Sequence, residues 1–181
     1  ILKIDNEVHY TRELDDPKIN EADFVILPSS IIAHETETTI LKKIKHKQVF
    51  VTGIFSNILR DKYQEDNTVI VKNEADTFFY NLQKLGKLNK EFLLSIFKDN
   101  TLINQFYSPV NLDDLPFPDW SEYSKRYPLR NDFFSLNQKI AVPILATRGC
   151  PYSCFNYCTY PLQQGRKVRA RSVENLIKEI K

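Results

Sequence analysis

Residues 22–30 read ADFVILPSS, a continuous apolar run that ends in small hydroxyl residues. A strand that is buried on both faces of a parallel sheet has this composition. Residues 36–47, TETTILKKIKHK, follow with apolar side chains at helical spacing, and residues 48–57, QVFVTGIFSN, bring a second buried-strand pattern that ends at Gly53. This order of strand, helix and strand predicts an α/β fold with a parallel sheet and a right-handed crossover.

Two helices are expected to cover this sheet. The first lies within residues 36–47, and a third strand at residues 68–73, TVIVKN, leads into a second helix at residues 74–87. Gly86, near the end of the second helix, suits a left-handed helix cap. The side chains expected to face the sheet are Ile40, Leu41, Ile44, Phe78, Phe79 and Leu82.

The pattern loosens after the second helix. Residues 89–97, NKEFLLSIF, suit either a short helix or a strand. Residues 108–128 are rich in Pro and Asp, which predicts an ordered linker with Phe117 and Trp120 as anchors against a domain. We therefore divide the chain into a partial α/β domain at residues 1–90, a linker at 91–138 and a third part at 139–181.

The third part places a cysteine-rich loop between a strand and a helix. Residues 139–150, KIAVPILATRGC, are mostly apolar and predict the strand. Ser172 suits the N-cap of the helix, whose buried face is expected to hold Leu176, Ile177 and Ile180. In a β/α barrel the loops after the strands build the active site, so the cysteine loop lies where chemistry is expected.

Composition narrows the class of protein. The 181 residues carry a net charge of +2 and 42% hydrophobic residues, which is ordinary for a globular protein. No apolar run approaches the roughly 20 residues of a transmembrane helix. Clustered cysteines without a secretory signal indicate a reducing compartment, so we expect a cytoplasmic protein. The chain has no Met and opens and ends inside patterned segments, so we expect it to be an internal piece of a longer protein.

All three cysteines stand in residues 148–161, RGCPYSCFNYCTYP, with three residues between neighbours. A loop this tight can aim three sulfur atoms at one point. Three thiolates suit an iron–sulfur cluster with one iron left open, whereas a structural zinc site needs a fourth ligand. The histidines that could supply a fourth ligand stand far upstream, at His9, His34 and His46. The spacing favours a cluster, with zinc or unconnected thiols as alternatives.

The segment RGCPYSCFNYC resembles the cluster-binding loop of the radical S-adenosylmethionine (SAM) superfamily. The family pattern has two residues between its last two cysteines, whereas residues 155–157 make three here, with Tyr157 at the position of the family's aromatic residue. The resemblance implies that Cys150, Cys154 and Cys158 bind a [4Fe-4S] cluster whose open iron holds SAM. Reductive cleavage of SAM would then give a 5′-deoxyadenosyl radical. The resemblance also implies that the third part begins a radical SAM (β/α) barrel.

Residues 112–120, LDDLPFPDW, resemble the linker of the subfamily that carries an amino-terminal cobalamin-binding domain. The first domain would then be part of that Rossmann-like domain, although the family's Asp-x-His-x-x-Gly motif is absent. The resemblance implies that Ser29, Ser30 and Gly53, at successive strand ends, contact the nucleotide tail of cobalamin. The plain alternative is that small residues end buried strands because turns require them.

The activity implied by this resemblance is cobalamin-dependent methyl transfer or a related radical modification. The substrate is expected to be a small or lipid-like molecule, with flavodoxin or ferredoxin as electron donor and without nucleic acid or a membrane span. One alternative is a methylthiotransferase that modifies tRNA, which would need a second cluster, yet no cysteine precedes Cys150. The other is a non-catalytic module that binds zinc or carries free thiols.

The basic run QQGRKVRAR at residues 163–171 has three interpretations. It could bind nucleic acid, or it could form an exposed strand beside an anionic cofactor, with Val168 and Ala170 facing inward. A solvated charged loop is the third interpretation. Gln163, Gln164 and Gly165 follow the cysteine loop closely and are expected to shape a cofactor pocket.

Overall fold

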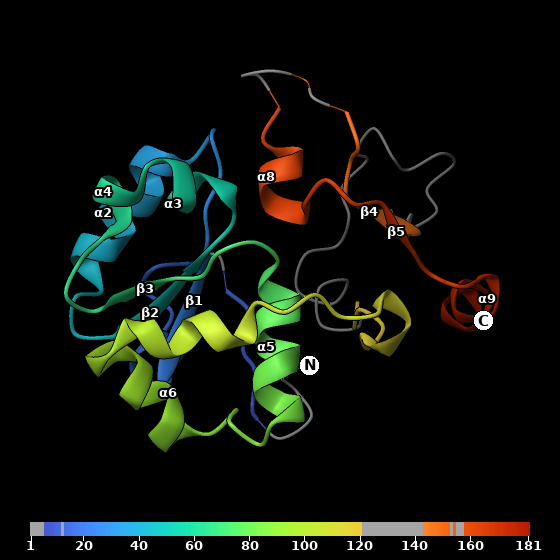
Figure 1. Ribbon diagram of the computed structural model, residues 1–181. Coiled ribbons are helices and arrows are strands. Elements are labelled where there is room, and N and C mark those ends of the chain that lie inside the picture. The colour runs from blue at the N-terminus through green and yellow to red at the C-terminus, as the bar shows by residue number, and fades with distance from the viewer. Residues whose placement is uncertain (1–5, 12, 121–142, 153, 155–157) are drawn as a thin grey trace, which may run out of the picture.

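The computed structural model describes residues 6–11, 13–120, 143–152, 154 and 158–181. Its amino-terminal part is a three-layer α/β/α arrangement, with a parallel sheet between helices (Figure 1). The described strands of this sheet are β1 (Phe24–Pro28), β2 (Gln48–Thr52) and β3 (Thr68–Ile70), in the order β1-β2-β3. The mixed α/β fold and the parallel sheet are as predicted, and they are compatible with a Rossmann-like fold.

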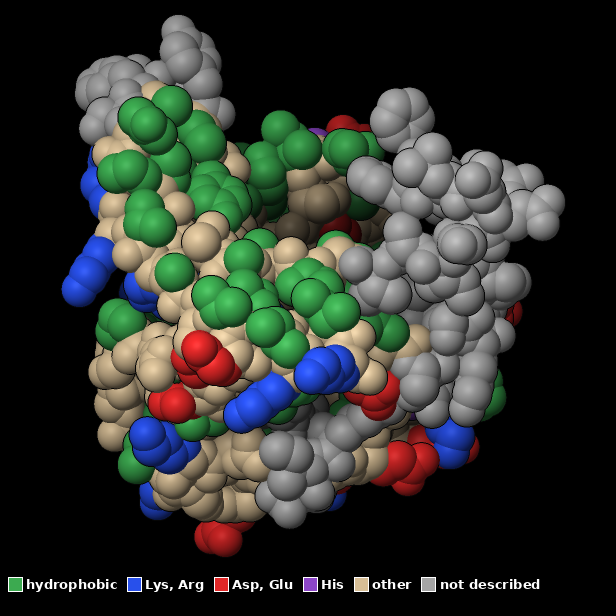
Figure 2. Space-filling model, turned by 90° about the vertical axis from the view of Figure 1, so that its right-hand side faces the viewer, with side chains coloured by type: hydrophobic (Ala, Val, Ile, Leu, Met, Phe, Trp, Pro, Cys, Tyr) green, Lys and Arg blue, Asp and Glu red, His purple; other side chains and the backbone are tan. Residues whose placement is uncertain are grey.

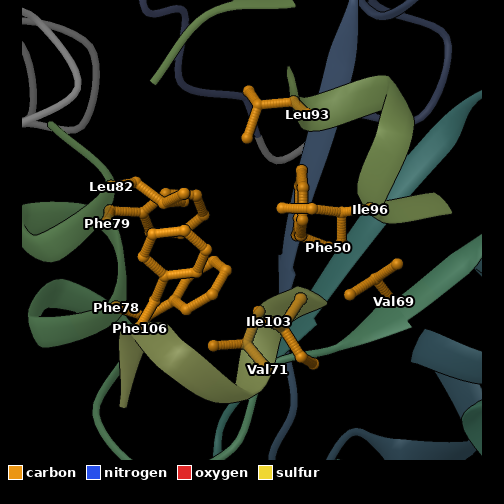
Figure 3. Close-up of a cluster of buried hydrophobic side chains, with 10 residues drawn as sticks. All are labelled: Phe50, Val69, Val71, Phe78, Phe79, Leu82, Leu93, Ile96, Ile103 and Phe106. Carbon is orange, nitrogen blue, oxygen red and sulfur yellow. The ribbon is translucent and has the colours of Figure 1, made fainter. Parts of the chain in front are cut away.

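Helices pack on both faces of this sheet. The elements around it are α1 (Lys18–Glu21), α2 (His34–Lys43), α3 (Ile54–Ile58), α4 (Arg60–Tyr63), α5 (Ala75–Lys84), α6 (Lys90–Lys98) and the 3-10 helix η2 (Asn100–Phe106). Side chains of α2 and α4 form one hydrophobic core with the sheet. Side chains of α5, α6 and η2 form the other, which Figure 3 shows in close-up.

The central strand β2 supplies both cores. Its side chains alternate between the two faces of the sheet. Val49 and Val51 pack with α2 and α4, and Phe50 packs with α5 and α6. The Phe50 ring lies edge-on to Phe97, with ring centroids 4.9 Å apart, and also contacts Phe78. A strand that is apolar on both faces is thus buried on both, as its sequence predicts.

The predicted helices are confirmed, with their expected apolar faces turned to the sheet. Leu41, Phe78 and Leu82 are almost completely buried. Helix α5 ends in a Schellman motif: Gly86 has φ +64°, its N–H donates to Gln83, and the N–H of Lys87 donates to Leu82. The sequence left residues 89–97 open between helix and strand, and they form helix α6.

Strand β1 differs from its prediction in one respect. The run at residues 22–30 was expected to be buried on both faces, but β1 is only half-buried and Ile26 is 37% exposed. The reason is its place in the sheet: within the described chain β1 pairs with β2 alone, so one side of it has no neighbouring strand. A continuous apolar run predicts a strand and does not by itself distinguish an edge from a centre.

The α/β core also extends past residue 90. Helix α6 contributes Leu93 and Ile96 to the core around Phe50, and η2 contributes Ile103 and Phe106. These two elements were assigned to the linker. The following segment is held to α5 by the Asn81 amide, which donates to the carbonyls of Phe106 and Ser108, and it contains the short 3-10 helix η3 (Leu112–Asp114).

The carboxyl-terminal part is a small two-stranded antiparallel ladder with two helices. Its elements are β4 (Thr147–Arg148), α8 (Tyr160–Gln164), β5 (Arg169–Ala170) and α9 (Val173–Ile180). Of the strand predicted at residues 139–150, the described residues form only β4, while Ile144 and Leu145 are exposed and outside any strand. A radical SAM barrel is therefore not shown by the described part of the chain.

The end of the chain forms the predicted helix, but not the predicted burial. Ser172 caps α9 by accepting a hydrogen bond from the N–H of Asn175 at 3.1 Å. The expected buried face is wrong for Ile177 and Ile180, which are 45% and 67% exposed. Helical spacing identifies an apolar face but not the element that covers it. Figure 2 shows apolar side chains gathered on the face of the molecule that carries α9. None of the described helices is long and apolar enough to cross a membrane.

We expect Phe50→Ala to lower the free energy of unfolding by about 3–5 kcal/mol, because it empties the contact between β2, α5 and α6. Chemical denaturation monitored by circular dichroism measures this change. Ile32→Ala is the control, because Ile32 is 96% exposed and its truncation should stay within about 0.5 kcal/mol. Equal effects of the two variants would contradict the assignment of this core.

Candidate functional site

The carboxyl edge of the parallel sheet, defined by Ser29 after β1 and Gly53 after β2, brings two predicted site residues together. The N–H of Ser29 donates to the carbonyl of Thr52 at 2.6 Å. Gly53 has φ +98°, and a Cβ atom built on it would lie 2.7 Å from the carbonyl oxygen of Ser29. A side chain at this position would meet backbone, so the close approach of the two strand ends requires glycine.

The hydroxyl groups at this edge take part in contacts within the chain. Ser29 Oγ accepts a hydrogen bond from the N–H of Ser56 at 2.9 Å, at the start of α3. The N–H and the hydroxyl of Ser30 both donate to Glu37 Oε1, at 2.9 and 3.2 Å. The structure thus gives these small residues a role in packing the edge. Their contact with a cofactor stays a prediction.

Glu37 and Tyr63 form a buried polar pair beneath this edge that the sequence analysis missed. The Tyr63 hydroxyl donates to Glu37 Oε2 at 2.6 Å, and both residues are buried. Burial, followed by the hydrogen bond and the charge of Glu37, raises the pKa of Tyr63. A signal existed: Glu37 lies four and seven residues before Leu41 and Ile44, so it shares their inward face of α2.

The cysteine loop leaves β4 through a turn that only glycine fits. Gly149 has φ +88°, and a Cβ atom on it would lie 2.1 Å from the carbonyl oxygen of Lys167. Its N–H donates to Gln164 Oε1 at 3.2 Å, and the N–H of Cys150 donates to the carbonyl of Gly165 at 3.1 Å. The first cysteine is therefore held against the turn that ends α8. The expectation that Gln163, Gln164 and Gly165 shape a cofactor pocket stays a prediction.

The three thiols have different surroundings. Cys150 is half-buried, Cys154 and Cys158 are exposed, and all three are free of disulfides. Among the described residues, no group of three or more His, Cys, Asp and Glu side chains is placed to hold a metal ion. Tyr157 lies outside the described residues. Three free thiols suit the chemistry of a thiolate-bound cluster, but the described arrangement does not gather them.

Two arginines connect the ladder of β4 and β5 to the start of helix α5. Arg148 forms a forked ion pair with Asp76, at 2.9 and 2.5 Å, and Arg169 contacts Glu74 Oε1 at 2.7 Å. Burial of the Arg148 guanidinium lowers its pKa, but the hydrogen bond to Asp76 and the charges of Asp76 and Glu74 outweigh this effect, so the pKa is raised. Glu74 and Asp76 stand at the start of α5, close after β3. These contacts join segments far apart in the sequence.

One of the three interpretations of the basic run places Val168 and Ala170 on the inward side of a strand. This orientation is wrong, because both residues are exposed. Arg169 and Arg171 face inward instead, and Arg171 pairs with Glu179. The Arg171 guanidinium also lies 5.5 Å from the centre of the Phe117 ring, so this predicted anchor does contact another part of the chain. Inward-facing charges are stable here because each has a carboxylate partner.

Comparisons with known proteins give one distant relative. The chain is 25% identical over 142 residues to the bacteriochlorophyllide d C-12(1)-methyltransferase of Chlorobaculum tepidum. The match covers 77% of this chain but only 27% of that protein, so the chain spans about a quarter of its relative's length. No family model matches the chain, and no solved structure matches it.

We expect Gly149→Ala to disrupt the start of the cysteine loop, whereas Gly165→Ala should be milder. Both glycines have positive φ, so both variants carry a strain of about 1–3 kcal/mol, but only at Gly149 would the new methyl group meet backbone. Hydrogen exchange should therefore rise at residues 147–150 and 167–170 far more in Gly149→Ala. Equal exchange in the two variants would contradict the close approach of Lys167.

Proposed function

We propose that this chain is part of a radical SAM methyltransferase whose cluster-binding loop is the segment from Cys150 to Cys158. The observation that carries the proposal is a set of three free, evenly spaced cysteines that follows β4 through an obligatory glycine turn. The similarity to a methyltransferase over most of the chain supports it. Because the chain covers about a quarter of that relative, activity and substrate are proposals as well.

In this proposal Cys150, Cys154 and Cys158 hold a [4Fe-4S] cluster, because cysteine thiolates are its usual ligands. When bound, the cluster supplies a coordination position for SAM and the electron that cleaves its sulfonium. The chain supplies position: Gly149 admits the close approach of residues 165–167, and the hydrogen bond to Gly165 fixes the backbone of Cys150. The exposure of Cys154 and Cys158 leaves their thiols accessible to metal.

Cobalamin is the second part of the proposal. Ligands of open α/β sheets bind outside the carboxyl ends of the strands, and Ser29, Ser30 and Gly53 lie at that edge. As arranged, their polar groups are engaged by the chain itself, so a cofactor would have to meet the outer surface of this edge. The methyl acceptor would be a small or lipid-like molecule, and flavodoxin or ferredoxin would supply electrons.

A zinc-binding or free-thiol module is the competing function. One observation favours its free-thiol form: the described residues do not gather three metal ligands. Metal content separates the two. After anaerobic reconstitution with iron and sulfide, we expect the purified protein to contain iron and acid-labile sulfide. We expect the complete enzyme, reconstituted in the same way, to cleave SAM. Stoichiometric zinc without iron would refute the radical SAM assignment.

Alanine at Cys150, Cys154 or Cys158 should each remove the bound iron, because two thiolates hold a cluster poorly. Iron and sulfide analysis with the visible absorption spectrum measures this loss. Tyr152→Phe is the matched control, since Tyr152 lies in the same loop, is 72% exposed and carries no thiol. A Cys158→Ala variant that keeps a full cluster would show that another residue is the third ligand.

Bound corrin absorbance after gel filtration tests the cobalamin part. We expect hydroxocobalamin to bind the complete protein, and Ser29→Val to weaken binding at least tenfold by adding bulk at the carboxyl edge. Thr101→Val is the control, because it makes the same kind of change away from the carboxyl edge. The Thr101 hydroxyl donates a hydrogen bond to Asp99 at the opposite edge of the sheet. If the complete protein retains no corrin, the cobalamin part of the proposal is refuted, and the proposed enzyme uses SAM without cobalamin.

A further inference from the structure

Arg148 and Arg169 face each other across the ladder of β4 and β5, where they are direct cross-strand partners. Like charges directly opposite in an antiparallel pair are destabilising. Both side chains are also largely shielded from solvent, at 16% and 18% exposure, so water screens their repulsion only in part. This short ladder therefore needs opposite charge from elsewhere.

The opposite charge comes from the start of helix α5. Glu74 Oε1 lies 2.7 Å from Arg169 Nη2 and 3.5 Å from Arg148 Nη1, so it stands between the two guanidinium groups. Asp76 takes the other side of Arg148 in a forked pair. Two positive and two negative charges balance, and the carboxylates lie at the start of α5, where the helix dipole also favours negative charge.

We propose that these four residues, Arg148, Arg169, Glu74 and Asp76, form a charged joint that sets the position of the cysteine loop against the carboxyl edge of the sheet. Arg148 is followed directly by Gly149 and Cys150, so the forked pair with Asp76 fixes the backbone at the first thiol. The joint is supported by the ion-pair distances among these four residues, whereas its importance for catalysis rests on the proposed function.

Exposed ion pairs of the described chain have a different character. Lys90 and Asp23 also meet at 2.5 Å, but their side chains are 64% and 56% exposed, and such pairs contribute little. The joint is more shielded, since the Arg148 side chain is 16% exposed and that of Asp76 39%. Removing the carboxylate leaves the shielded guanidinium with less opposite charge. The start of α9 has its own tether, since Asp113 accepts from the N–H of Ser172 at 2.9 Å. Breaking the joint should therefore loosen the cysteine loop before it frees α9.

The test uses Asp76→Asn in the complete, metal-free protein, with iodoacetamide as the probe and mass spectrometry to follow each cysteine. Asp76 also accepts a hydrogen bond from the N–H of Thr77. The asparagine side chain keeps an oxygen that can accept this bond, but it has no charge. We expect the alkylation rate of Cys150 to rise at least threefold, because this thiol is half-buried. Cys154 and Cys158 are already exposed, so their rates should stay unchanged and serve as internal standards.

Asp23→Asn is the matched control, since it makes the same change in an exposed pair, and all three rates should remain those of the parent protein. Arg148→Gln should raise the Cys150 rate as Asp76→Asn does, and the double variant should add nothing further. Arg148→Lys, which keeps the charge without the fork, should restore part of the protection. Circular dichroism verifies folding, and Arg148→Gln carries the test if Asp76→Asn does not fold.

An unchanged Cys150 rate in a folded Asp76→Asn protein would overturn the joint. A parallel rise at all three cysteines would overturn it as well, because that result means general loosening rather than positioning. Since the measurement is made without metal, it is independent of iron analysis. A failed cluster reconstitution would refute the proposed function and leave the joint standing.

Discussion

Burial of β2 on both faces is the constraint on which the rest of the structure depends. Val49 and Val51 on one side and Phe50 on the other cannot be shielded by a single layer, so helices must cover both faces of the sheet. Parallel strands joined by those helices then end at one edge. That edge brings Ser29 beside Gly53 and directs the start of α5, with Glu74 and Asp76, toward the cysteine-bearing part of the chain. The site is thus a consequence of how the core is filled.

Two kinds of contact then fix the cysteine loop, and they act at different levels. Backbone geometry acts at Gly149, where positive φ and the nearness of the Lys167 carbonyl admit no side chain. Electrostatics act one residue earlier, where Arg148 reaches across to Asp76. The first contact shapes the loop against its own neighbours, and the second relates that shape to the sheet. A glycine turn alone could not do this, because all its partners belong to the same small ladder.

The sequence predicted the three strands of the parallel sheet and the helices α2, α5 and α9, and few of the contacts. The helices followed from apolar residues at every third or fourth position, and the strands from short continuous apolar runs. Burial in β1 was overestimated because an apolar run carries no information about strand order. The inward turn of Arg169 was missed for a related reason: alternation separates two faces without saying which is buried. The pairs of Arg148 and Arg169 join residues 72 and 95 positions away, a separation that no local pattern encodes. Glu37 alone carried a readable signal, its place on the apolar face of α2.

The unequal exposure of the three thiols fits the proposed function in a specific way. Cys150 is held by its own N–H and, through Arg148, by the sheet, whereas Cys154 and Cys158 are exposed. A metal centre that bound this chain would find one ligand in place and would have to draw in the other two. Binding energy would then be spent partly on bringing these two thiols to the metal, which couples metal binding to folding.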